Sequence, residues 1–70
     1  MKLYINGQER EFADLDAKPV LTHLITLLAM KADRIAVEHN GEIAPRSAWE
    51  QVALQSGDKL EIVQFVGGGE

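Results

Sequence analysis

The sequence predicts an α+β domain in which a mixed sheet of four to five strands wraps around one main helix. Three observations favour this fold class. Apolar and polar residues alternate near both ends of the chain, as in strands with one buried face. A single stretch between them has helical periodicity, and Asn-Gly pairs mark tight turns. With 70 residues and no cysteine, the chain can form one small domain without disulfides or a thiol nucleophile.

The first elements are a hairpin. Residues 1–6 alternate, which places Leu3 and Ile5 on one face of a strand. The pair Asn6-Gly7 predicts a type I′ turn, because both central positions of that turn need positive φ. Residues 8–13 then form the return strand, with Phe12 as its core anchor, and a polar connection follows.

A helix is expected from Val20 to about Met30. Pro19 fits its first turn, where a missing N–H costs nothing. Val20 and Leu27 widen an apolar face whose members have the i, i+3, i+4, i+7 spacing, namely Leu21, Leu24, Ile25 and Leu28. Residues 31–34 are expected to form the exit loop.

Shorter elements complete the chain. A strand over residues 35–38, a turn at 39–41 and a brief further strand at 42–44 are expected, and Pro45 would confine that last strand to an edge or terminate it. Ser47 and Glu50 have capping-box spacing, so one or two helical turns should follow Ser47, with Trp49 closing the core. His23 and His39 are expected at the surface. A right-handed crossover returns these strands to the first hairpin, which predicts the β-grasp, or ubiquitin-like, arrangement.

The last strand is where function is expected. Leu60 and Ile62 should face the helix, so Val63 and Phe65 fall on the outward face and suggest a docking surface, which Tyr4 on the first strand could extend. The alternative is that Phe65 folds back over the end of the sheet as a local lid. We therefore divide the chain into a β-grasp domain at residues 1–66 and a flexible glycine tail at 67–70. The tail reaches about 10 Å when extended, and its glycines suit a cleft too narrow for side chains. Frayed chain ends also contain glycines, so the tail alone leaves both interpretations open.

Two segments resemble the ThiS family, the sulfur carriers of thiamine biosynthesis. They are residues 40–49, NGEIAPRSAW, and residues 57–69, GDKLEIVQFVGGG. The resemblance implies that Gly69 bears the reactive carboxyl group, that Gly68 lets the backbone fit a partner's channel, and that Gly67 adds reach. The family's chemistry takes place on a terminal glycine, whereas Glu70 follows Gly69 here. Removal of Glu70, its addition on expression, and loss of sulfur carriage are the three explanations, and we favour the first two.

The resemblance also implies partners. An adenylating enzyme of the ubiquitin-activating type would use ATP and magnesium to activate the carboxyl group, and a sulfur donor such as a cysteine persulfide protein would convert it to a thiocarboxylate. Thiazole synthase would consume that sulfur. The chain itself would bind no cofactor and would be a carrier, not an enzyme. Alternatives are a molybdopterin-synthase-type small subunit, a ubiquitin-like protein modifier and an inert β-grasp interaction module.

Composition argues against several other classes. The formal net charge of −4 disfavours nucleic acid and anionic membranes as partners. No apolar run approaches the ~20 residues of a transmembrane helix, and the N-terminus lacks the pattern of a secretory signal, so a cytoplasmic protein is expected. No metal-ligand spacing and no paired carboxylates indicate a metal site or acid–base catalysis.

Overall fold

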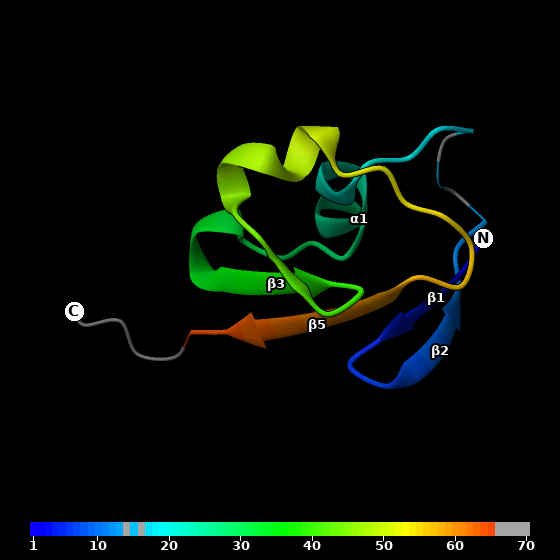
Figure 1. Cartoon of the computed structure of the whole chain (residues 1–70), viewed down its shortest axis with the longest axis horizontal. Helices are drawn as coiled ribbons and strands as arrows, with labels where there is room; N and C mark the ends of the chain where they lie inside the picture. The colour runs from blue at the N-terminus through cyan, green and yellow to red at the C-terminus, as the bar shows by residue number, and fades with distance from the viewer. Residues whose placement is uncertain (14, 16, 66–70) are drawn as a thin grey trace.

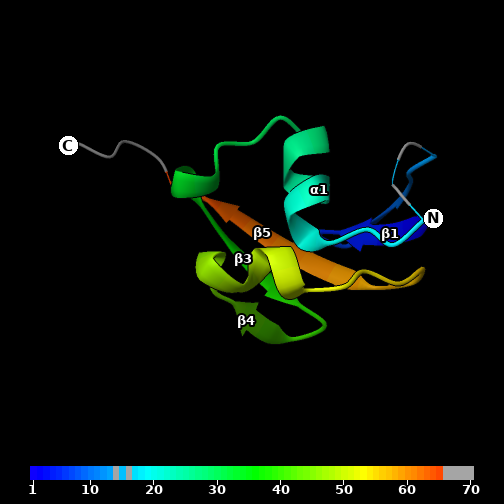
Figure 2. The same ribbon diagram turned by 90° about the horizontal axis from the view of Figure 1, so that it is seen from above.

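The computed structural model describes residues 1–13, 15 and 17–65. One five-stranded sheet has the strand order β2-β1-β5-β3-β4, with α1 on one face (Figures 1 and 2). The central strand β5 pairs parallel with β1 and antiparallel with β3, so the sheet is mixed and the predicted fold class is confirmed. The elements are β1 (Lys2–Ile5), β2 (Gln8–Glu11), α1 (Leu21–Leu27), η1 (Ala32–Arg34), β3 (Ile35–His39), β4 (Glu42–Ala44), η2 (Arg46–Gln51) and β5 (Lys59–Gln64).

The core lies between α1 and the inner face of the sheet. Leu60 and Ile62 are buried there, as their alternation predicts, and Phe12 is buried beyond the end of β2. Trp49 is also buried and donates its indole N–H to the carbonyl oxygen of Ala44 at 2.7 Å. This bond satisfies the polar atom of the largest aromatic side chain, so Trp49 has the structural role that the sequence predicts. The largest fully buried side chains are Leu3, Leu21, Leu24, Leu60 and Val37.

Both Asn-Gly pairs form the expected hairpin turns. Asn6 and Gly7 have φ of 52° and 82°, and Asn40 and Gly41 have φ of 51° and 87°. The Asn6 side chain has a second role. Its Oδ1 accepts from the N–H of Ile62 at 2.7 Å, and its Nδ2 donates to the carbonyl of Ile62 at 3.1 Å. Asn6 therefore bonds to β5 as a further strand residue would, although the backbone of β1 has already turned away.

The second turn holds β5 from the other side. Asn40 accepts at Oδ1 from the N–H of Lys59 at 2.9 Å, and its own N–H donates to the Lys59 carbonyl at 2.8 Å. Two asparagines thus fasten the central strand to its neighbours at β1 and β3. The sequence predicts the turns but does not indicate these side-chain bonds.

The helix is shorter than predicted at both ends. Pro19 is not in its first turn, because extended backbone at Pro19 and Val20 pairs with residues 52–54 before α1 begins. Leu54 donates its N–H to the Pro19 carbonyl at 3.0 Å. At the other end Leu27 is 43 % exposed, so it does not widen the apolar face as expected. Leu28, just past α1, packs against the core as a partly buried residue.

The helix ends at an alanine with left-handed backbone. Ala29 has φ of 60°, its N–H donates to the Thr26 carbonyl at 3.0 Å, and the Met30 N–H donates to the Ile25 carbonyl at 3.3 Å. These two bonds form a Schellman motif, in which glycine is the favoured residue at the left-handed position. Alanine there carries a steric cost that glycine avoids.

We expect Ala29→Gly to stabilise the domain by about 0.5–1 kcal/mol. Relief of the left-handed strain, roughly 1–2 kcal/mol, exceeds the added entropy of glycine in the unfolded chain, about 0.4–1 kcal/mol. Urea unfolding measures the difference. Ala36→Gly in β3 is the matched control and should destabilise, because a strand gains nothing from glycine. A lower urea midpoint for Ala29→Gly would contradict the assignment of strain.

The segment after β4 also differs from its prediction. A short helix is present, but it is the 3-10 helix η2, its N-cap is Pro45, and Ser47 lies inside it. No side chain caps it, because the Pro45 carbonyl instead accepts from the Ala48 N–H at 2.8 Å.

Among the described residues, no helix is both long enough and apolar enough to cross a bilayer.

Candidate functional site

The end of β5 is held firmly up to the last described residue. β5 pairs with β3 as far as Gln64, and the N–H of Phe65 then donates to the Arg34 carbonyl at 2.7 Å. Any segment that follows therefore begins at a fixed point, the end of the central strand. The predicted tail residues Gly67, Gly68 and Gly69, together with Glu70, lie outside the described residues, so the division of the chain at residue 66 stays a prediction.

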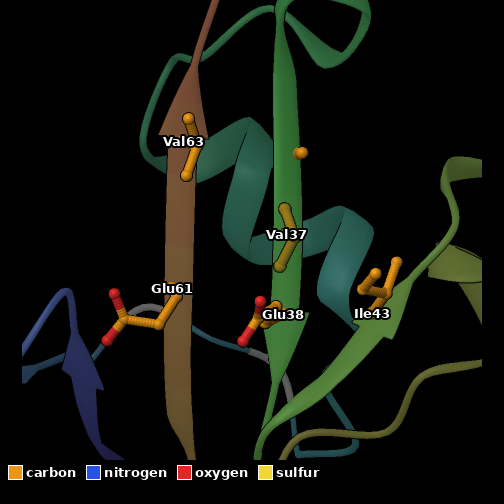
Figure 3. Close-up of a pocket in the computed structure, with 6 residues that line it drawn as sticks. Val37, Glu38, Ile43, Glu61 and Val63 are labelled. Carbon is orange, nitrogen blue, oxygen red and sulfur yellow. The ribbon is translucent and has the colours of Figure 1, made fainter.

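Beside this point, apolar side chains cover the outer face of the sheet. Val63 and Phe65 are 59 % and 54 % exposed, in the outward phase that the sequence predicts. Val63 is in register with Ala36 on β3, and Ile43 on β4 is 78 % exposed. Figure 3 shows Val63 and Ile43 on either side of β3. We name Ala36, Ile43, Val63 and Phe65 the outer patch.

Tyr4 shares the outer face but is separate from the outer patch. It is in register with Lys59, four positions before Val63 along β5 and hence about 13 Å away. It borders a different hollow, together with Gly7, Lys59 and Glu61. The structure brings Val63 and Phe65 to one end of the sheet and places Tyr4 toward the other.

Ile43 and Ala36 are the members of the outer patch that sequence reasoning missed, and Ile43 is the larger of the two. β4 has three residues, and both Ile43 and Ala44 are apolar, so alternation does not say which of them faces inward. The register settles it, because Ala44 pairs with buried Val37 while Ile43 pairs with exposed Glu38. The larger residue consequently faces out.

The start of β5 carries a polar cluster. His39, expected at the surface, has a side chain only 22 % exposed, with Nε2 at 2.7 Å from Asp58 Oδ2. Burial alone would raise the pKa of Asp58, but hydrogen bonds from His39, the Gln55 N–H and Asn40 outweigh it and hold that pKa below its ordinary value. The cluster fixes the loop before β5 to the β3–β4 turn. It lies at the opposite end of β5 from Phe65.

Fold and surface together define a ubiquitin-like β-grasp protein whose central last strand ends beside an exposed apolar patch. The chain belongs to the ThiS family, which it matches over residues 3–69. That match includes the glycines after β5.

Solved structures agree with this assignment. The crystal structure of the thiamine biosynthesis protein ThiS from Geobacter metallireducens superimposes with a TM-score of 0.82 at 31 % identity, covering 99 % of this chain and 100 % of that one. The solution structure of a thiamine biosynthesis protein from the same organism gives a TM-score of 0.78 at 32 % identity, covering 100 % and 90 %.

Relatives in sequence include much longer proteins. A thiazole synthase of Paramagnetospirillum magneticum is 49 % identical over 69 residues, which are 99 % of this chain but 20 % of that protein. A thiazole synthase of Magnetococcus marinus is 33 % identical over 100 % of this chain and 21 % of its own length. The chain thus spans about a fifth of these two relatives. A protein named ycf40 from Pyropia yezoensis is 37 % identical over 99 % of this chain and 93 % of its own length.

Proposed function

We propose that this chain is a sulfur carrier of thiamine biosynthesis, which carries sulfur as a thiocarboxylate on Gly69 and donates it for thiazole formation. The observation that carries the proposal is the match to the ThiS family through residue 69. The fold supports it, since β5 is the central strand and its end is fixed to β3. A stable body of this kind suits the presentation of a chain end to other proteins.

The chemistry explains why partners are needed. A carboxylate is a poor electrophile because its oxygen is a poor leaving group. An adenylating enzyme of the ubiquitin-activating type would supply ATP and magnesium, and attack of the carboxylate on the α-phosphate would expel pyrophosphate. The outer sulfur of a donor such as a cysteine persulfide protein would then displace AMP to give an acyl disulfide. A thiol would attack the donor's cysteine sulfur in that disulfide, which releases the thiocarboxylate and leaves the donor in a new disulfide. In this scheme the chain is a substrate of its partners and not an enzyme.

Thiazole synthase is the proposed acceptor of the sulfur. Two proteins named thiazole synthase contain a segment similar to this whole chain. A carrier and the enzyme that consumes its cargo gain effective concentration when they share one chain. These relatives therefore support a functional link between the carrier domain and thiazole formation.

ATP–pyrophosphate exchange with the purified adenylating enzyme of the same organism tests the first step. We expect a chain that ends at Gly69 to support magnesium-dependent exchange, and a chain that retains Glu70 to support none, because the glycine carboxyl is then in a peptide bond. Adding a host extract that removes Glu70 should restore exchange. Absence of exchange with the Gly69-ended chain would contradict the proposal.

A further inference from the structure

Two glutamates occupy opposite positions on neighbouring strands beside the outer patch. Glu38 on β3 is in register with Glu61 on β5, and both residues are exposed. Figure 3 shows them at the same level of the two strands, with the Glu38 carboxylate directed toward β5 and the Glu61 carboxylate directed away from β3, so that β5 lies between the two groups. Like charges directly opposite each other on antiparallel strands are destabilising. No ion pair joins either carboxylate to another residue of the described part of the chain.

The same two residues line a hollow with an apolar remainder. Its other lining residues are Ala36, Val37, Ile43 and Val63. The hollow therefore offers apolar side chains from Ile43 and Val63 beside two acceptor groups, with Ile43 in register with Glu38 and Val63 two residues farther along β5 than Glu61. A side chain with an aliphatic stem and a cationic head matches both parts, and a planar guanidinium can reach two carboxylates at once.

We propose that this hollow receives an arginine of the adenylating enzyme, with its stem on Val63 and Ile43 and its guanidinium between Glu38 and Glu61. The inference rests on the proposed function and specifies how the partner is recognised. A tail of about 10 Å at full extension leaves the body close to the enzyme that receives Gly69. The sheet face beside the end of β5 then lies within the contact area, and the bound cation relieves a repulsion that the free carrier keeps.

Neutral variants separate this role from a structural one. Glu38→Gln and Glu61→Gln should each weaken binding to the purified adenylating enzyme about tenfold, measured by isothermal titration calorimetry. The same changes should raise the melting temperature of the free carrier by about 2 °C, because they remove the like-charge pair. Opposite signs for affinity and stability are the signature expected of a site built for a partner's cation.

Two controls complete the test. Glu50→Gln on η2 makes the same charge change away from the outer patch and should leave affinity unchanged. In the Glu38→Gln, Glu61→Gln double variant the two losses should not add, because one guanidinium serves both carboxylates. Increasing salt should weaken the unaltered carrier more than the double variant.

Three results would overturn the inference. They are unchanged affinity in both single variants, a fall in melting temperature that accompanies the fall in affinity, and weaker binding to thiazole synthase with unchanged binding to the adenylating enzyme. Pyrophosphate exchange distinguishes failure of the arginine-site inference from failure of the proposed function. If only the arginine site is wrong, the variants support exchange with an unchanged KM, whereas if the function is wrong the unaltered Gly69-ended chain supports none.

Discussion

Gly68→Ala should lower the rate of Gly69 adenylation by about a hundredfold while leaving the melting temperature of the domain unchanged. In the proposed scheme the added methyl group would sit one residue from the reacting carboxyl carbon, where we expect the partner to hold the backbone in a narrow channel. Misplacement of reacting groups by about 1 Å can cost a factor of this size. Pyrophosphate exchange with the Gly69-ended carrier measures the rate, and thermal unfolding measures stability.

Gly67→Ala is the matched control. It adds the same methyl group one residue farther from the carboxyl group, where we expect the tail to supply reach, so its effect on exchange should be clearly smaller. Equal rates for the Gly68→Ala variant and the unaltered carrier would contradict the channel argument. Equal losses for both variants would show that the whole tail is enclosed.

Asn6→Ala should destabilise the domain by about 3 kcal/mol, from a total on the order of 5 kcal/mol for a chain of this size. The change removes both bonds to the backbone of Ile62, and a polar group left without a partner costs about 1–3 kcal/mol. Residue 6 has a left-handed backbone with φ of 52°. Alanine lacks the side-chain amide that offsets the steric cost of this conformation in asparagine, which adds roughly 1 kcal/mol to the loss. Urea unfolding followed by circular dichroism measures the loss.

Two further variants divide this loss into its parts. Asn6→Gly keeps the turn and removes only the amide, so it should cost less than Asn6→Ala. Asn6→Asp accepts from the Ile62 N–H but cannot donate to the Ile62 carbonyl. Above pH 5 its free energy of unfolding should lie between those of the Asn6→Gly and Asn6→Ala variants. A loss below about 0.5 kcal/mol for Asn6→Ala would show that the side chain is not needed to hold β5.

The sequence predicts most of the fold because the relevant signals are local. Asn6-Gly7 and Asn40-Gly41 are short-range turn signals, and each forms the expected hairpin. The helix boundaries depend on tertiary pairing instead. Pro19 bonds to Leu54, far away in sequence, and Ala29 ends the helix in a conformation that its side chain does not favour. Neither event is visible in the periodicity of residues 20–30.

The candidate site was predicted in part for the same reason. Val63 and Phe65 follow from alternation along one strand, and both are exposed as expected. Ile43, Glu38 and the separation of Tyr4 depend on how β3, β4 and β1 are aligned with β5, which is set by register and not by composition. The roles of Gly68 and Gly69 come from the family resemblance, and the described residues end at Phe65 before either is reached.

Intact-mass analysis of the Gly69-ended carrier is the most direct test of the central claim. The carrier is incubated with ATP, magnesium, the adenylating enzyme, a persulfide donor and a thiol reductant, and thiazole synthase is added afterwards with its other substrates. The account predicts a mass gain equal to the replacement of one oxygen by sulfur, located on Gly69, which is lost again when thiazole forms. An unchanged carrier mass in the complete mixture, with an adenylating enzyme that loads a known ThiS protein, would contradict the account.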